Sequence, residues 1–259
     1  MQHSALGQPV RAATVTDDSQ YFAGFDTECD PSASTLRTVW LDTDVYSVGL
    51  YIGGVDMACD GGTQPNLNAS YIENITDCTY GCWNLTLYWV GMQAPCSGWA
   101  NQFSENTSTA FTQGEDQAID AYNEAVNTLG MGTETPLTYD LEAYTGSQCN
   151  ALAASESFIK GWDTQLGIAP AQDSGVYGSS CGSYLSDYTG SPPPVFIDGA
   201  NWNDTQPNPD TASILCIPNG DWVDNQRLKQ YENSQAFYGM SVDYDSLDGP
   251  QYAYPPESN

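Results

Sequence analysis

The sequence predicts an α/β fold, an irregular (β/α)8 TIM-like barrel whose helices are reduced in the second half. The chain has 259 residues, enough for one large barrel domain. Eight short apolar segments rich in β-branched and aromatic residues are typical of buried strands. Helical patterns separate the early segments, whereas the connections after the fifth segment are poor in them.

The predicted strands are short and are bounded by polar residues, glycine or proline. They are Gln20–Asp26, Tyr46–Ile52, Leu85–Met92, Pro136–Tyr144, Gly175–Gly178, Val195–Asp198, Leu228–Glu232 and Ser241–Asp245. Apolar residues at helical spacing predict helices in the stretches between them. These are a helix through Leu36 and Trp40 capped by Ser32 or Ser34, then Asn66–Ile75, Thr107–Leu129, Cys149–Leu166 and a weak helix at Ser183–Tyr188.

The pattern places one domain between two tails. We expect a flexible N-terminal tail over residues 1–19, a barrel domain over residues 20–246 and an extended C-terminal tail over residues 247–259. No apolar run is long enough to span a bilayer, so we expect no membrane insertion. The sequence leaves the oligomeric state open.

The chain is strongly acidic, with 33 Asp and Glu against 5 Lys and Arg and a formal net charge of −28. This charge excludes nucleic acid and anionic membranes as the main partner. It suits a neutral or cationic partner, an acidic medium in which carboxylates are partly protonated, or a medium of high salt.

The cysteines and sequons indicate a secreted glycoprotein. Because His3 is the only histidine, the cysteines favour disulfides over a metal site, and we expect all of them to be paired: Cys29, Cys59, Cys78, Cys82, Cys96, Cys149, Cys181 and Cys216. We expect Cys59–Cys96 to join the loops after the second and third strands, and Cys78–Cys82 to close a short loop. Sequons for surface glycans begin at Asn68, Asn74, Asn84, Asn106 and Asn203.

The strand Pro136–Tyr144 carries two acidic residues, Asp140 and Glu142, whose side chains alternate to the same face. Two neighbouring carboxylates at the end of an apolar strand are difficult to ionise together, so they tend to take different protonation states and roles. The alternative is that both are solvated at the strand end or cap the next helix.

The ends of other predicted strands carry further carboxylates. In a barrel the C-terminal ends of parallel strands share one rim, where barrel active sites lie. This rule brings together the carboxylates Asp26, Asp140, Glu142, Asp198 and Asp243. Asp26 and Asp243 should be close, because the first and last strands of a closed barrel are neighbours. Their convergence favours an enzyme.

Several motifs resemble a known family in the family's own order. They are Gly24-Phe25-Asp26-Thr27, Tyr51-Ile52-Gly53-Gly54, Gly91–Cys96, Tyr139-Asp140-Leu141-Glu142-Ala143-Tyr144, Gly175–Ser179 and the closing segment Val242–Asp245. Together they resemble the glycoside-hydrolase-like family called domain of unknown function 1906. That family is similar to glycoside hydrolase family 25, the lysozyme-type muramidases with an irregular barrel.

The resemblance implies a catalytic site made of Glu142, Asp140, Asp26 and Asp243. Glu142 would be the general acid that protonates the glycosidic oxygen. Asp140 would orient or stabilise in the manner of substrate-assisted enzymes, in which an N-acetyl group attacks the anomeric carbon. The other two carboxylates would hold the proton of Glu142 and the sugar.

Further residues at strand ends are candidates for binding a polysaccharide or oligosaccharide. Aromatic faces stack on pyranose rings, and side-chain amides and carboxylates bond hydroxyls; the candidates are Tyr51, Gln93, Tyr177, Asp198, Trp202 and Tyr231. For the aromatic members the alternative is that they close the barrel core.

These observations favour a secreted glycoside hydrolase that acts on a cell-wall or microbial polysaccharide. The alternative is an extracellular carbohydrate-binding or structural protein that has kept the barrel and lost turnover. Calcium at the acidic rim is a weaker idea, because no consecutive Asp-x-Asp-x-Asp loop supports it. We therefore expect neither a metal nor a cofactor.

Overall fold

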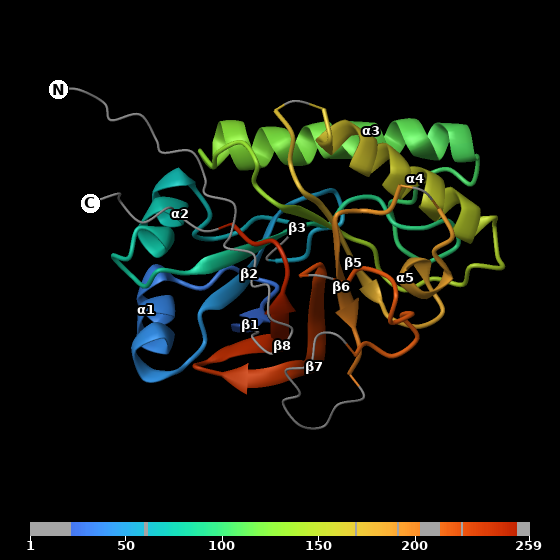
Figure 1. Ribbon diagram of the computed structural model, residues 1–259. Coiled ribbons are helices and arrows are strands. Elements are labelled where there is room, and N and C mark those ends of the chain that lie inside the picture. Colours follow the sequence, from blue (N-terminus) through green and yellow to red (C-terminus); the bar gives the residue numbers. More distant parts are fainter. Residues whose placement is uncertain are drawn as a thin grey trace.

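The computed structural model describes residues 22–59, 62–168, 170–190, 192–202, 213–223 and 225–252. Its eight strands close a barrel in chain order (Figure 1). They are β1 (Phe22–Asp26), β2 (Ser47–Gly53), β3 (Asn84–Trp89), β4 (Leu137–Asp140), β5 (Ser174–Ser179), β6 (Phe196–Ala200), β7 (Arg227–Phe237) and β8 (Met240–Asp248). The predicted barrel is therefore confirmed. The tail predicted at residues 1–19 lies outside the described residues.

Strand direction changes at the end of the barrel. Strands β1 to β6 each pair in parallel with the next strand along the chain, but β8 is antiparallel to both β7 and β1. The expectation that the last strand runs parallel to the others is wrong. A tight hairpin explains it, because Tyr238 and Gly239 at its tip take φ angles of 47° and 82°, as the favoured two-residue turns require.

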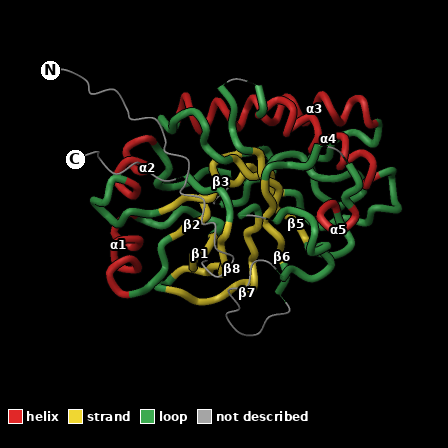
Figure 2. Tube along the Cα trace, in the orientation of Figure 1, coloured by secondary structure: helices red, strands yellow, loops and turns green. Residues whose placement is uncertain are grey.

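The helices lie outside the barrel strands (Figure 2), and those of the described residues all precede β6 in the chain. They are α1 (Ala33–Asp42), α2 (Ala69–Thr76), α3 (Thr107–Tyr122), α4 (Ala151–Leu166) and α5 (Tyr184–Asp187), with a π-helical segment, Asn123–Thr128, continuing α3. Ser32 caps α1 by accepting a hydrogen bond from the Thr35 amide. Among the described residues the chain forms no helix after α5, in agreement with the predicted loss of helices.

Helices α3 and α4 cross at a pair of glycines. A Cβ at Gly114 would lie 2.0 Å from the carbonyl oxygen of Phe158, and a Cβ at Gly161 would lie 2.0 Å from that of Phe111. The two backbones therefore approach more closely than any larger residue allows. Phe158 fills the space beneath them and stacks on Phe103 with the ring centroids 4.3 Å apart.

Every helix in the described part of the chain is too short or too polar to cross a membrane.

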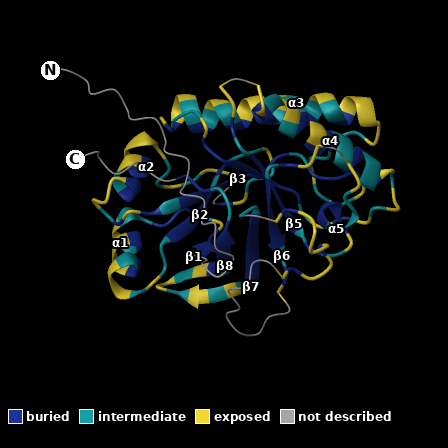
Figure 3. Cartoon of the chain, viewed as in Figure 1, coloured by how far each residue is buried: buried dark blue, intermediate teal, exposed yellow. Residues whose placement is uncertain are grey.

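The two faces of the barrel wall have different compositions. Outward-pointing residues of the strands join the helices in one large apolar core, and the strands are largely buried apart from the hairpin that joins β7 to β8 (Figure 3). Inside the barrel only its lower end is apolar, where Phe196, Leu228 and Leu247 form a small separate cluster. Below it Gln251 bonds to the hydroxyls of Ser47 and Thr86, so the chain packs on the barrel beyond the boundary predicted at residue 246.

All eight cysteines are paired in the structure. The pairs are Cys29–Cys59, Cys78–Cys82, Cys96–Cys149 and Cys181–Cys216. The predicted Cys78–Cys82 pair is confirmed, and the predicted Cys59–Cys96 pair is wrong. The loop after β2 packs on the loop after β1 instead, where the Gln64 side chain and the Asp30 amide form a hydrogen bond of 2.7 Å.

Candidate active site

Asp26, the last residue of β1, is held by side chains from two other strands. The Tyr51 hydroxyl donates to Asp26 Oδ1 at 3.1 Å, and Gln230 Nε2 donates to Oδ2 at 2.7 Å. Gln230 Oε1 in turn accepts from the Tyr177 hydroxyl at 3.0 Å and from Trp202 Nε1 at 2.8 Å. Asp26 is only 2% exposed, and these hydrogen bonds fix the position of its carboxyl group.

Asp140 and Glu142 lie two residues apart at the C-terminal end of β4. The strand ends at Asp140, so Glu142 lies just beyond it rather than within it as the sequence predicted. Gln93 clamps this segment, because its Nε2 donates to the Asp140 carbonyl oxygen at 2.9 Å and its Oε1 accepts from the Glu142 amide at 2.9 Å. Asp140 is 2% exposed and its Oδ1 has no hydrogen-bond partner among the described residues.

Asp243 reaches the same rim because β8 is antiparallel. Its Cα pairs with that of Asp26 across β1 and β8. In a parallel strand this position, close to the start of β8, would lie at the opposite end of the barrel. The Ser234 amide donates to Asp243 Oδ1 at 2.6 Å, and the side chain is partly exposed.

Two further carboxylates lie deeper in the barrel. The Tyr88 hydroxyl donates to Asp198 Oδ2 at 2.5 Å. Asp245 is 1% exposed, and both Asp198 Oδ1 and Asp245 Oδ1 have no partner among the described residues. Space for this layer depends on Gly49, where a Cβ would lie 2.5 Å from Asp26 Cβ and 2.7 Å from the Tyr88 ring.

These six carboxyl groups, which we call the carboxylate cluster, all have a pKa raised above the ordinary value. The cluster is Asp26, Asp140, Glu142, Asp198, Asp243 and Asp245. Burial is the largest cause for every member and raises the pKa of Asp198 to about 6. The negative charge of Glu142 raises the pKa of Asp140 further, and that of Asp243 raises the pKa of Glu142. The cluster therefore retains protons at pH values where exposed carboxylates have lost theirs.

The predicted sugar-binding residues occupy three kinds of place. Tyr51 and Tyr177 point into the barrel mouth, where their hydroxyls bond to Asp26 and Gln230. Trp202 stands at the mouth with 51% of its surface exposed. Tyr231 lies on the outer face of the hairpin, since it follows the inward-pointing Gln230 and stacks on Tyr244.

Gln93 and Asp198 are both fully buried. The Gln93 amide is engaged with main-chain groups of the β4 segment, and Asp198 bonds to Tyr88. Both therefore hold the walls of the site and do not face solvent.

Sequence inspection missed Gln230, Tyr88 and Asp245. The alternation that pairs Asp140 with Glu142 also places Asp245 on the face of Asp243, so this residue could have been found. The role of Gln230 depends on its position opposite Asp26 in the folded barrel. Among the described residues, no group of three or more His, Cys, Asp or Glu side chains is arranged to hold a metal ion.

The described sequon residues lie at the surface or partly exposed. Asn68 and Asn106 are exposed and cap α2 and α3, accepting hydrogen bonds from the amides of Tyr71 and Thr109. Asn74 and Asn84 are partly exposed, and Asn203 lies outside the described residues. The Nδ2 atom of Asn106, which a glycan would occupy, makes no hydrogen bond to a described residue, whereas that of Asn68 donates to the Asn66 carbonyl oxygen at 2.7 Å.

Comparison with known proteins identifies the family. The sequence profile described as "Rv2525c-like, glycoside hydrolase-like domain" matches residues 38–248. Because this match covers most of the chain, the chain belongs to that family. None of the curated proteins matches it.

Solved structures with a similar fold include the modular autolysin LytC from Streptococcus pneumoniae, at a TM-score of 0.52 and 15% identity. That match covers 88% of this chain, which spans only 46% of the autolysin. A family 25 glycosyl hydrolase from Bacillus anthracis matches at a TM-score of 0.48 and 12% identity, with 98% of this chain and 96% of that chain covered. The spore cortex lytic enzyme SleM from Clostridium perfringens matches at 0.49 and 15% identity, covering 88% of this chain and 67% of that chain. At these identities the likeness to LytC supports the barrel fold alone.

Proposed function

We propose that this member of the Rv2525c-like family is a secreted glycoside hydrolase that cleaves a cell-wall or microbial polysaccharide containing N-acetylated sugars. The observation that carries the proposal is the carboxylate cluster at the barrel mouth, in which Glu142 is partly exposed and has a raised pKa. A partly exposed carboxyl group that keeps its proton can meet a glycosidic oxygen and protonate it.

In the proposed reaction Glu142 donates its proton to the leaving oxygen as the glycosidic bond breaks. The acetamide oxygen of the substrate attacks the anomeric carbon, and water later opens the resulting cyclic intermediate and returns a proton to Glu142. The negative charge of Glu142 raises the pKa of Asp140, so in this proposal the two neighbouring groups do not both ionise readily and Glu142 delivers the proton. Asp140 orients the acetamide.

The remaining residues divide into groups that contact the sugar and groups that position others. Asp243 and Trp202 are at least partly exposed, so we assign them to substrate contact. Tyr51 and Tyr177 line the same mouth. Gln93 and Gln230 are positioning residues, because the first holds the Glu142 segment and the second holds Asp26.

A carbohydrate-binding protein without turnover is the second candidate. The observation that favours it is the depth of Asp26, Asp140, Asp198 and Asp245, each 2% exposed or less. A substrate can reach only the outer members of the carboxylate cluster unless the site opens.

Secretion is supported by the four disulfides, which form and persist in oxidising compartments. The exposed sequon residues Asn68 and Asn106 agree with it. Expression in a secretory host, followed by removal of N-glycans and mass measurement, tests both features. An unmodified protein that folds only with reduced cysteines would contradict them.

The activity test incubates the wild type, Glu142→Gln and Asp120→Asn with chitotetraose, peptidoglycan glycan strands and cellotetraose. We expect cleavage of the N-acetylated substrates only. Glu142→Gln should reduce kcat by about 10²–10⁴-fold through loss of general acid catalysis. Asp120 is exposed on α3, so its variant controls for a change of one charge.

Undiminished activity in Glu142→Gln would contradict the assignment of the acid, and cleavage of cellotetraose would contradict the acetamide nucleophile. Tight binding of a glycan without any cleavage by the wild type would favour the binding protein.

A further inference from the structure

A pocket of about 230 Å³ lies outside the barrel, between α4, α5 and the loop that leads to β6. Its lining includes Tyr184 and Tyr188 together with Glu156, Lys160 and Asp163. None of the lining residues belongs to the carboxylate cluster, so neither the family match nor the proposed catalytic function accounts for the pocket.

Two aromatic rings form one wall of this pocket. The rings of Tyr184 and Tyr188 are 5.5 Å apart and inclined at 57°, and Tyr188 also contacts the ring of Trp222 at 5.2 Å. The Tyr188 hydroxyl is shielded from solvent and has no partner among the described residues. Tyr184 is only 2% exposed and Tyr188 is partly exposed, so a ligand would meet the ring of Tyr188.

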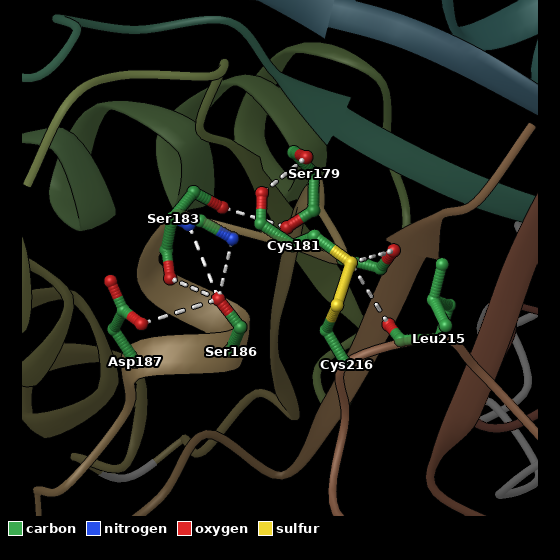
Figure 4. The surroundings of a disulfide bond; sticks show 9 residues. Ser179, Cys181, Ser183, Ser186, Asp187, Leu215 and Cys216 are labelled. Atoms are coloured by element: carbon green, nitrogen blue, oxygen red, sulfur yellow. Dashed lines mark hydrogen bonds between the residues drawn. A yellow bond between two sulfur atoms is a disulfide. The ribbon is translucent and has the colours of Figure 1, made fainter.

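The wall is held in place before any ligand arrives. Cys181–Cys216 ties the segment before α5 to a distant loop (Figure 4). Ser183 and Ser186 form a capping box at the start of α5, and the Ser183 hydroxyl donates to the Ser179 carbonyl oxygen at 2.7 Å. Such anchoring reduces the entropy lost when a ligand binds.

The opposite wall carries both donors and acceptors. Glu156, Lys160 and Asp163 fall on one face of α4 because they are four and three residues apart. Glu156 Oε1 accepts from the Thr189 amide at 2.9 Å, and Asp163 Oδ1 accepts from the Ser174 hydroxyl. The other oxygen of each carboxylate and the Lys160 ammonium have no partner among the described residues, so they are available to a ligand.

We infer that this pocket is a second carbohydrate-binding site, for a neutral pyranose. The partly exposed ring of Tyr188 offers a face for the C–H surface of the sugar, and the carboxylate oxygens and the ammonium group bond its hydroxyls. The two carboxylates outnumber the single ammonium group, so an anion would be repelled. A neutral polyhydroxylated ring offers hydroxyl donors to the carboxylate oxygens and hydroxyl acceptors to the Lys160 ammonium.

The site goes beyond the proposed catalytic function and does not depend on turnover. Residues 156–163 lie on the outer helix, whereas the carboxylate cluster lies inside the barrel mouth. A long polysaccharide could occupy both, which would raise the local concentration of chain near the barrel mouth.

The test titrates the isotopically labelled full-length protein with methyl β-D-glucopyranoside and with chitotetraose, and follows amide signals by nuclear magnetic resonance. Chitotetraose is used in Glu142→Gln to prevent cleavage. We expect shifts at Lys160, Tyr184 and Tyr188. Tyr188→Ala should weaken binding there by about tenfold through loss of the stacked ring, and Tyr238→Ala should leave it unchanged because this exposed tyrosine lies on the hairpin.

Lys160→Ala provides a variant that keeps the fold, since its side chain is exposed and unpaired among the described residues. It should weaken pocket binding without altering the hydrolysis of a short soluble substrate. Shifts confined to the barrel mouth, an unchanged affinity in Tyr188→Ala and Lys160→Ala, or preferential binding of 1,4-diaminobutane or inorganic phosphate would overturn the inference. Loss of catalysis alone would bear only on the proposed function.

Discussion

The two faces of the barrel wall differ in what they bury. Behind the outer face, α4 buries Phe158 against Tyr139 of β4, and Gly161 of α4 lies against the backbone of α3. Inside, the barrel buries Asp26, Asp140, Asp198 and Asp245. Apolar burial favours folding by about 25 cal/mol per Å², whereas each buried carboxyl group opposes ionisation. The outer layer therefore stabilises the protein, and the interior holds carboxyl groups to which we assign the proposed chemistry.

We expect the largest effect on stability when an aromatic ring is removed from the outer layer. Phe158 is fully buried and contacts the rings of Phe103 and Tyr139 at 4.3 and 4.9 Å. Phe158→Ala should lower the free energy of unfolding by about 3–5 kcal/mol, measured by denaturant unfolding, while kcat per folded molecule stays constant. Ile119→Ala, on the exposed side of α3, is the control. A loss below about 1 kcal/mol would show that the outer layer is not the main source of stability.

Replacing a buried carboxyl group of the interior should raise the free energy of unfolding at neutral pH, whereas removing a ring from the outer layer lowers it. The pKa of Asp198 is raised from 3.8 to about 6 by burial. Between about pH 4 and pH 6 the folded protein keeps this proton and the unfolded chain releases it, so stability falls as pH rises. The shift of about two units corresponds to about 3 kcal/mol lost by pH 7.

Asp198→Asn should therefore equal the wild type near pH 4 and exceed it by up to about 3 kcal/mol at pH 7. The amide oxygen can still accept from the Tyr88 hydroxyl. Unfolding curves at several pH values test this, with Asp120→Asn measuring the general effect of one fewer charge. If both variants gain equally, overall repulsion rather than burial of Asp198 governs the pH dependence.

The glycine crossing of α3 and α4 tests how closely the outer layer is packed. Gly161→Ala places a methyl group against the Phe111 carbonyl oxygen, so it should lower the melting temperature and remove about 1–3 kcal/mol. Gly167→Ala is the matched control, because Gly167 caps the same helix with φ of −71° and has more room for a Cβ. Equal stability of the two variants would contradict a close helix crossing.

The smallest effect concerns the pH profile of the proposed hydrolysis. Activity should fall as Glu142 loses its proton, and the negative charge of Asp243 raises the pKa of Glu142. Asp243→Asn should therefore move the alkaline limb of the pH profile to lower pH. If the alkaline limb moves to higher pH or stays in place, the charge of Asp243 does not raise the pKa of the catalytic acid.

Much of the fold and part of the site could be predicted from local pattern. The spacing of two residues keeps Glu142 near enough to Asp140 for its charge to raise the pKa of Asp140, and the Asn/Ser caps and apolar spacing locate the helices. These features depend on residues a few positions apart, so they are present in the sequence alone. The roles of Gln93 and Tyr231 could not be predicted in this way. Whether a side chain is buried, and which side of the barrel wall it points to, depends on the segments that pack around it.

The sequence by itself determined the eight strands, the placement of acidic residues at or near their ends, and an even set of cysteines. Only the tertiary structure decided the antiparallel direction of β8, the partners of Cys59 and Cys96, and the contact of Gln230 with Asp26 across 204 positions. The physical reason is that backbone periodicity is a local property, whereas register, loop packing and the burial that raises a carboxyl pKa arise when distant segments exclude water together.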